Sequence, residues 1–346
     1  MRAVGLDLGN PFERILDLVQ IVGVPVGDEI AAVIGKRSGT HARAFSHVDH
    51  TDTRLPPTVR LVVNIGRYGE ILGRARRDGH GHTVNDEQMS AQDHDHITRK
   101  SFEQQVGLFV GDDSLFARRP ASTLAWLEPL DPGMVVLDVA CGAAHASEIA
   151  APHVRQVVGV DLTPALLAVG AERLRAAGID NVLLQEGHAA ALPFVDASFD
   201  LVFCRTALHH FPDPERCVVE MARVCRPGGR VVLSDMIAPS AEVRDAFDEL
   251  HHQIDPSHVH CLLEAEIADV LGRAVGPMTY GETGSMRLPI DVMLTEASER
   301  DIALAALQRD LSGDAPTGFD PVVTDDGIVV SFVGTVMHAT RLQARP

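Results

Sequence analysis

The sequence has no long uninterrupted apolar run. No stretch of its 346 residues reaches the roughly 18 uncharged apolar residues that a membrane-spanning helix needs. Asp7, Glu13 and Asp17 interrupt the apolar residues near the N-terminus, which makes this segment a poor signal peptide. We therefore expect a cytoplasmic protein that does not act at a membrane, and its 45% hydrophobic content is enough to build a full core.

Paired cysteines are also missing. The five cysteines are odd in number and no two of them have CxxC spacing. This pattern argues against a disulfide framework and against a CxxC metal site, so we expect reduced thiols.

Positive charge is scarce and unevenly spread. The formal net charge is −18, yet residues 1–87 carry eleven basic and eleven acidic residues. The rest of the chain therefore has 19 basic residues against 37 acidic ones. Because an acidic surface repels phosphate, we expect no nucleic-acid partner.

Apolar segments alternate with helical intervals in the middle of the chain, which predicts an α/β fold with a parallel sheet and crossover helices. The predicted strands are 134–140, 156–161, 181–186, 199–205 and 230–235. Beyond them the pattern indicates helices at about 241–254, 264–274 and 290–311, and then a strand over 327–340. Helices inserted late in such a sheet commonly cover the ligand site at the carboxyl ends of the strands.

The turn after the first predicted strand contains only small side chains. Residues 134–142 read MVVLDVACG, and the turn from Ala140 to Ala144 lets backbone N–H groups approach a ligand. Asp161 ends the second predicted strand, 19 residues after Gly142. A carboxylate about 20 residues beyond a glycine turn is placed to accept both hydroxyl hydrogens of a ribose. These residues therefore predict a site for a nucleotide-like cofactor.

A dinucleotide fits this turn poorly. The G-x-G-x-x-G pattern of Rossmann dehydrogenases is absent, because Gly142 follows Cys141 and precedes two alanines. A pyrophosphate therefore has no matching cradle, and we rank a dehydrogenase well below the alternative that follows.

Four sequence blocks resemble the class I S-adenosylmethionine-dependent methyltransferases, and most closely the small-molecule branch with the ubiquinone/menaquinone C-methyltransferases. The blocks are VVLDVACGAAH at 135–145, VVGVDLTPALL at 157–167, the segment 191–235 with ALHHFPDPERC and RPGGRVVLSD, and IDPSHVH at 254–260. The resemblance covers roughly residues 97–341. It implies a Rossmann-like, mostly parallel seven-stranded sheet with helices on both faces and a helical cover over the substrate cleft.

The resemblance also implies which residues hold S-adenosylmethionine. Asp138 opens the first motif, Asp161 grips the ribose and Leu162 lies against the adenine. The full set implied for the cofactor is Asp138, Ala140, Gly142, Asp161, Leu162, His188, Ala189 and Arg205.

Two positions depart from the family pattern. Ala144 stands where a second glycine is usual, and its methyl group is expected to narrow the space for the cofactor tail. His188 replaces the aspartate that accepts from the adenine amine. A neutral imidazole accepts through one ring nitrogen or stacks, and a protonated one cannot accept, so cofactor affinity is expected to fall at low pH.

His209 and His210 are the candidate catalytic residues, because they follow the fourth predicted strand beside the expected methyl group. Histidine titrates near working pH, and methyl transfer needs a base only for some acceptors. A second group, His251, His252, His258 and His260, is placed to line the acceptor pocket. We expect no metal, since these residues have no recognised ligand spacing; the alternative is that His251, His258 and His260 converge with Asp255.

The resemblance implies a methyltransferase that acts at C, O or N of a small-molecule acceptor, and it is compatible with a homodimer. The alternative is a methyltransferase-like cofactor-binding protein without turnover. We expect a methyltransferase domain at 89–346, with its cofactor core at 134–237 and the cover and last strands at 238–346. Residues 1–88 carry no motif: they are either a small extra domain or a dispensable extension before a start at Met89.

Overall fold

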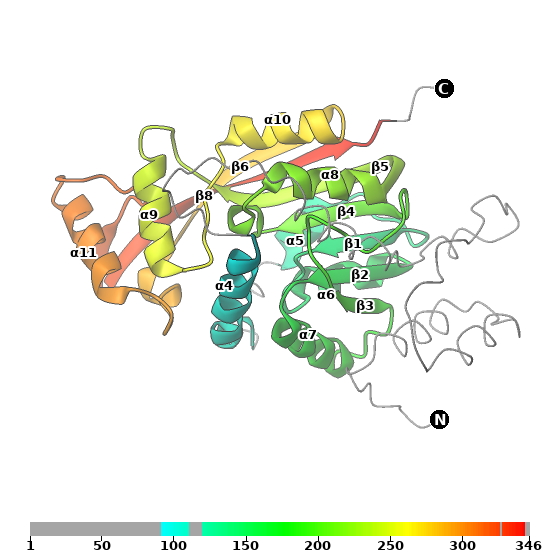
Figure 1. Cartoon of the computed structure of the whole chain (residues 1–346), viewed down its shortest axis with the longest axis horizontal. Coiled ribbons are helices and arrows are strands. Elements are labelled where there is room, and N and C mark those ends of the chain that lie inside the picture. The colour runs from blue at the N-terminus through cyan, green and yellow to red at the C-terminus, as the bar shows by residue number, and fades with distance from the viewer. Residues whose placement is uncertain (1–90, 111–119, 326, 343–346) are drawn as a thin grey trace, which may run out of the picture. The chain divides into compact units, whose positions relative to one another are not determined.

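The computed structural model describes residues 91–110, 120–325 and 327–342 (Figure 1). The segment 1–88, for which the sequence suggests either an extra domain or an extension, lies outside the described residues. Within the described residues no helix has both the length and the apolar character needed to cross a bilayer.

A single eight-stranded sheet organises the described chain, with strand order β3-β2-β1-β4-β5-β8-β6 and β7 paired to β8. The first five strands run parallel, whereas β6, β7 and β8 join as antiparallel partners. The strands are β1 Val135–Val139, β2 Gln156–Asp161, β3 Val182–Glu186, β4 Phe199–Arg205, β5 Cys225–Ile237, β6 Met278–Pro289, β7 Val322–Thr324 and β8 Gly327–Thr340. The predicted fold class is confirmed, and the strand beyond the expected seven is the three-residue β7.

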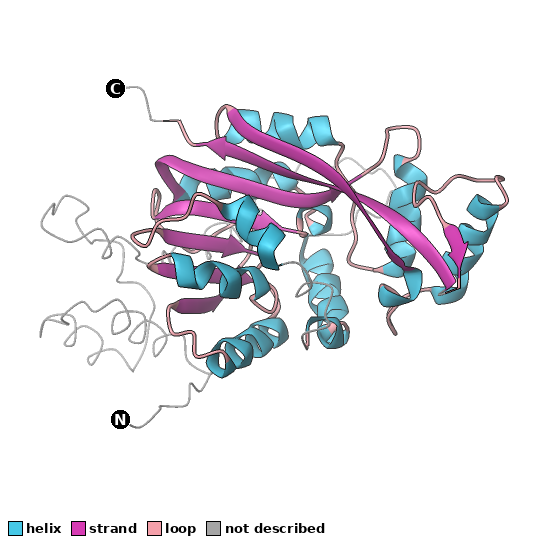
Figure 2. Ribbon diagram, turned by 180° about the vertical axis from the view of Figure 1, so that it is seen from behind, coloured by secondary structure: helices cyan, strands magenta, loops and turns pink. Residues whose placement is uncertain are grey.

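Helices cover both faces of the sheet. Side chains of α5 and α6 pack with β1, β2 and β4 in one apolar cluster, and Gly170 of α7 approaches Ala144 and Leu184 on the same face, while α8 contacts β4 and β5 from the other side (Figures 1 and 2). The helices are α4 Ala91–Gln104, α5 Pro120–Leu127, α6 His145–Ala150, α7 Pro164–Ala176, α8 Pro214–Val224, α9 Arg244–Ile254, α10 Glu264–Ala274 and α11 Arg300–Leu311, with 3-10 turns η2 Val106–Phe109, η3 Ala151–His153, η4 Leu208–His210 and η5 Ile290–Val292.

A second apolar core lies where β6 and β8 extend beyond the parallel strands. There α9 and α11 pack on the strand ends, as the left side of Figure 1 shows. The core consists of Ala238, Phe247, Leu250, Ile254, Cys261, Leu288, Ile290, Ala303, Ala306, Leu307, Phe319, Val330 and Phe332. This part of the chain therefore folds onto the carboxyl side of the sheet as the sequence predicted.

The predicted helix over 290–311 is wrong in its first half. Only η5 and α11 are helical, and the segment between them follows side-chain hydrogen bonds instead. Ser298 Oγ accepts from Thr295 N and donates to Ile254 O, and Glu299 N donates to Gln253 O. Ser and Thr side chains compete with helical hydrogen bonds in this way. Strand β6 was not predicted, because its Gly-containing, largely exposed sequence has no alternating apolar pattern.

The strand order reverses between β1 and β4. Open α/β sheets bind ligands at the carboxyl ends of the strands beside such a reversal. Here the carboxyl ends of β1, β2 and β4 carry Asp138, Asp161 and Arg205. The topology therefore gathers the predicted cofactor residues at one edge.

Candidate functional site

The turn between β1 and α6 has an unusual backbone. Ala140, Gly142 and Ala144 have φ values of 56°, 54° and 62°. Residues with side chains rarely adopt this left-handed region, and such strain concentrates at functional sites. Hydrogen bonds hold the turn, since Cys141 N donates to Val160 O (3.0 Å) and Ala144 N donates to Cys141 O (2.9 Å).

The methyl group of Ala144 is fully buried beside α7. A Cβ built on Gly170 of α7 would lie 3.1 Å from Ala144 Cβ and 3.1 Å from the backbone carbon of Ala143. Glycine at 170 therefore lets α7 approach the turn closely. The methyl group occupies space next to this helix, which removes the steric reason for expecting it to narrow the cofactor site.

Asp161 joins the turn to the end of β2. Its Oδ2 accepts from Gly142 N (2.8 Å) and its Oδ1 accepts from Thr163 N (2.8 Å). Burial raises the pKa of this carboxyl, and the two N–H donors and the charge of Arg99 act in the opposite direction. The side chain is thus fixed in one orientation by the backbone around it.

Asp138 lies deeper, inside the sheet. Only 1% of the residue is exposed, and Ser147 Oγ of α6 donates to its Oδ2 (2.6 Å). Burial raises its pKa to about 7, against the lowering effects of the Ser147 hydroxyl and the Arg205 charge. Arg205 also donates from Nη1 to Thr123 Oγ1 of α5 (3.1 Å), and burial lowers its pKa.

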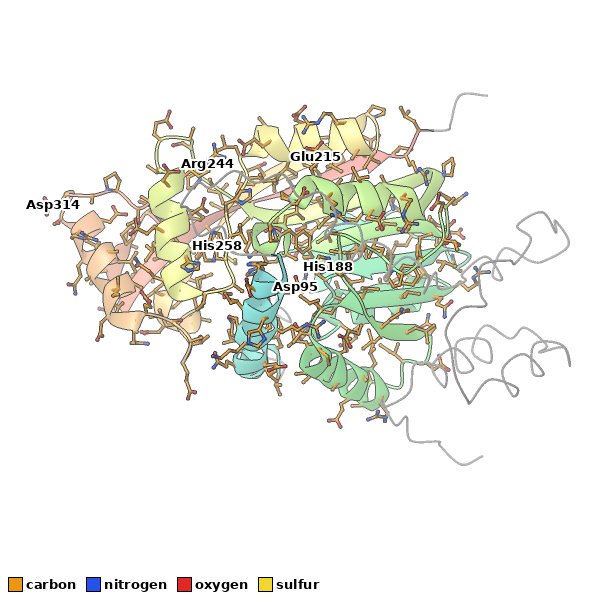
Figure 3. The ribbon with its side chains drawn as sticks, viewed as in Figure 1. Asp95, His188, Glu215, Arg244, His258 and Asp314 are labelled. Carbon is orange, nitrogen blue, oxygen red and sulfur yellow. The ribbon has the colours of Figure 1, made fainter. Side chains whose placement is uncertain are left out.

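His188 uses both ring nitrogens within the protein. Ala190 N donates to Nδ1 (3.0 Å), so the neutral ring carries its proton on Nε2, which faces Asp95 Oδ1 of α4 at 3.1 Å (Figure 3). His188 therefore cannot accept from an adenine amine, contrary to the mechanism expected from the sequence. The carboxylate beside position 188 belongs to Asp95. Leu162 follows the end of β2 and Ala189 comes shortly after the end of β3, and both residues are half-buried.

The adjacent His209 and His210 are both buried and point to different partners. His209 Nδ1 lies 2.6 Å from Asp235 Oδ1 near the end of β5, so Nδ1 carries a proton and donates it to the carboxylate. His210 Nδ1 lies 3.1 Å from Ser257 O, and its ring packs edge-on against Phe102. Burial and then the neighbouring His209 lower the pKa of His210.

Asp235 remains ionised although it is buried. Burial acts to raise its pKa, but His209 and the N–H groups of Ala207 and Leu208 outweigh it and hold the pKa below the usual range. The carboxylate also accepts from Met236 N (2.7 Å). Such a buried, fully bonded acid orients an imidazole instead of exchanging protons itself.

The structure separates the four residues of the second histidine group into two pairs. The rings of His251 and His258 are buried against the ring of His209, whereas His252 is exposed and His260 is half-buried, with its backbone N donating to His209 O (3.3 Å). The alternative set predicted for a metal does not assemble as expected, because Asp255 Oδ1 bonds Ser101 and Ser257.

Comparison with known proteins finds a match over the segment that contains the predicted cofactor residues. Residues 137–233 match the family model described as a methyltransferase domain. An uncharacterized methyltransferase, YcgJ, of Bacillus subtilis (strain 168) is 42% identical over 125 residues, which is 36% of this chain and 49% of the relative. Its crystal structure superposes with a TM-score of 0.59 at 25% identity, covering 65% of this chain and 98% of that one.

Residues 137–233 are thus similar to methyltransferase domains. A demethylmenaquinone methyltransferase of Bacillus cytotoxicus is 38% identical over 112 residues, 32% of this chain and 47% of the relative. The chain thus spans about half the length of these curated relatives in sequence. The family resemblance stated from the motifs is confirmed for this segment.

Two residues around the methyltransferase domain were missed by the sequence analysis. Asp235 was interpreted only as a strand end, although an acid at the tip of the fifth strand beside a His-His loop is a usable signal. Asp95 gave no signal, because it reaches His188 across 93 positions of sequence. Only the docking of α4 brings the two together.

Proposed function

We propose that the chain is an S-adenosylmethionine-dependent methyltransferase that acts on a small-molecule acceptor. The observation that carries this proposal is Asp161, bonded to the Gly142 turn inside a methyltransferase domain. Each carboxylate oxygen has about two lone-pair sites, and each one accepts a single backbone N–H here. The Thr163 hydroxyl also bonds this carboxylate, and we assign the ribose hydroxyls to the acceptor capacity that is left.

The neighbouring residues fit the other parts of this cofactor. Leu162, which follows Asp161 in the chain, offers an apolar side chain to the adenine. The small side chain of Ala189 leaves room for the ring. Asp95 is the acceptor that we assign to the adenine amine, with His188 as the residue that positions it. With this assignment a carboxylate still accepts from the adenine amine, although position 188 holds a histidine in place of the family's aspartate.

The methionine end is assigned to the turn and to the buried charges below it. Ala140 and Gly142 have small side chains, Asp138 supplies a buried carboxyl group and Arg205 a guanidinium. Bound there, the sulfonium supplies the methyl group for an in-line displacement. The chain's own task is to align the acceptor and to exclude water.

His209 and His210 are assigned to the acceptor side. Both lie at the carboxyl end of β4, and Asp235 fixes the orientation of His209. They are placed to orient an acceptor, and to take its proton where the acceptor carries one. Transfer to C, O or N of the acceptor is part of this proposal.

Calorimetry with S-adenosylmethionine and S-adenosylhomocysteine tests cofactor binding. Asp161→Ala removes two hydrogen bonds to a charged acceptor, each worth about 1.5–3 kcal/mol, so we expect affinity to fall by about 100-fold or more. Asp180→Asn is the matched control, because Asp180 is exposed, and it should bind as the wild type does. No binding by the wild-type chain would refute the proposal.

Turnover distinguishes the enzyme from the alternative, a cofactor-binding protein without activity. The assay measures S-adenosylhomocysteine released in the presence of small aromatic hydroxy compounds, quinols and amines. Release that depends on one acceptor supports the transferase. Tight binding with no release on any acceptor supports the alternative.

A further inference from the structure

Three buried imidazoles meet beyond the carboxyl end of β4. His209 belongs to η4, His251 to α9, and His258 to the loop after α9, and each is at most 4% exposed. The ring centroids of His251 and His258 are 4.1 Å apart, and His209 lies 5.6 Å and 5.8 Å from them. One nitrogen from each ring lies within 4.8 Å of those of the other two.

Hydrogen bonds leave a nitrogen open on each ring. His209 uses Nδ1 on Asp235, and His258 uses Nε2 on Asp248 Oδ1 at 2.8 Å. Nδ1 of His251 and Nδ1 of His258 are buried and have no hydrogen-bond partner among the described residues. Buried polar atoms without a partner are rare in native proteins, and an ion or water is a common reason for them.

We infer that His209, His251 and His258 form a binding site for a divalent cation of the zinc class. Three imidazoles with an open fourth position are typical of catalytic zinc, and imidazole ligands also suit copper, nickel and iron. Zinc lies about 2.0–2.1 Å from each nitrogen, so tetrahedral ligand atoms stand about 3.3 Å apart. In the structure the nitrogens lie within 4.8 Å of one another, and the stacked rings of His251 and His258, 14° from parallel, must turn for both to bind one ion.

The carboxylates behind two of the rings support this assignment. Metal-binding histidines usually donate their second N–H to a carboxylate, which fixes the tautomer and strengthens the ligand. Asp235 accepts this bond from His209, and Asp248 accepts it from His258. Asp235 and Asp248 are thus positioning residues for the cation.

A rival set shares one of these histidines. Asp248, His258 and Cys261 also lie within 4.8 Å of one another. Asp248 Oδ1, however, already accepts from His258 Nε2 and Cys261 N. The three-histidine set is favoured, because His251 and His258 each have a buried nitrogen without a partner among the described residues.

The inference goes beyond the proposed function and replaces the expectation of no metal. His209 takes the place of His260 in the set that the sequence suggested, and Asp235 and Asp248 take the place of Asp255. A base is not obligatory for methyl transfer. A cation on His209 is therefore compatible with the transferase, and its binding can be measured without cofactor or acceptor.

Metal content of the full chain tests the site. The protein is prepared without a histidine tag, stripped with chelator, exposed to Zn²⁺ or Co²⁺, desalted, and analysed by elemental mass spectrometry. We expect one tightly bound ion per chain and a visible Co²⁺ spectrum of four-coordinate type. His251→Gln and His258→Gln should lose the ion, and Asp248→Asn should weaken its binding about 10- to 100-fold.

His153→Gln is the matched control, because His153 is exposed in η3. It should retain the ion and the Co²⁺ spectrum. Circular dichroism of each variant separates loss of the ligand from loss of the fold, and a folded His251→Gln or Asp248→Asn is sufficient for the comparison. A wild-type chain without tight metal overturns the inference, and so does metal that persists in His251→Gln, His258→Gln and Asp248→Asn. Neither result would alter the calorimetric test of cofactor binding.

Discussion

Replacing Asp138 by asparagine should make the cofactor-free protein relatively more stable as the pH rises. In the fold the pKa of this carboxyl is about 7, because burial penalises its charge, against an ordinary value of 3.8. Between these values the folded state holds a proton that the unfolded chain has lost. Stability therefore falls with rising pH over this range.

The size of the effect follows from the two pKa values. One pKa unit corresponds to about 1.4 kcal/mol, so the carboxyl costs about 4 kcal/mol once the pH exceeds both values. From pH 5 to pH 8 the loss is about 2.7 kcal/mol. The asparagine side chain of the Asp138→Asn variant has the shape of the protonated acid, and its carbonyl can accept a hydrogen bond from the Ser147 hydroxyl. Unlike the acid, it does not titrate.

Urea unfolding of both proteins at pH 5, 6, 7 and 8 measures this difference. The advantage of Asp138→Asn over the wild type should grow by about 2.7 kcal/mol from pH 5 to pH 8, since all other titrating groups are shared. Asp180→Asn, at an exposed site, should show a difference that does not change with pH. An advantage of Asp138→Asn that stays constant, or shrinks, refutes the reasoning.

Other predictions concern the adenine end of the site, the packing of β2 and the assembly. Asp95→Asn should weaken S-adenosylmethionine binding about 10-fold in calorimetry, because it removes the charge of the carboxylate that we propose accepts from the adenine amine. Equal affinity would show that Asp95 does not have this role. Gly159→Ala should cost about 1–3 kcal/mol in urea unfolding, because its Cβ would lie 2.7 Å from Leu184 Cδ2, whereas Gly284→Ala, with open space around it, should be neutral. Light scattering of the full chain tests the predicted homodimer against a monomer.

Much of the parallel sheet could be predicted from residues 134–235. The strand at Phe199–Arg205 and the one at Gln156–Asp161 were predicted with the bounds that the structure has. Their buried apolar runs and the Pro and Gly residues between them leave few alternatives. The antiparallel part was less predictable, because β6 is largely exposed and its pairing with β8 depends on contacts far apart in sequence.

The residues of the candidate site likewise include some that the sequence could predict and some that it could not. Asp138, Gly142 and Asp161 could be found from the motifs, since the turn and the acid at the end of β2 have a fixed spacing. The partners of His188 and His209 could not, because Asp95 and Asp235 reach them from other elements. Hydrogen bonds of this kind depend on how helices dock, which local sequence does not encode.

The sequence by itself determined the parallel strands β1 to β5, the methyltransferase motifs and the acid at the tip of β2, because these depend on local propensity and on spacing along the chain. The tertiary structure decided that the carboxylate near position 188 comes from α4. It also decided that three histidines from separate segments meet with open nitrogens. Both arrangements arise from packing between elements distant in sequence, where burial fixes which polar atoms can find a partner.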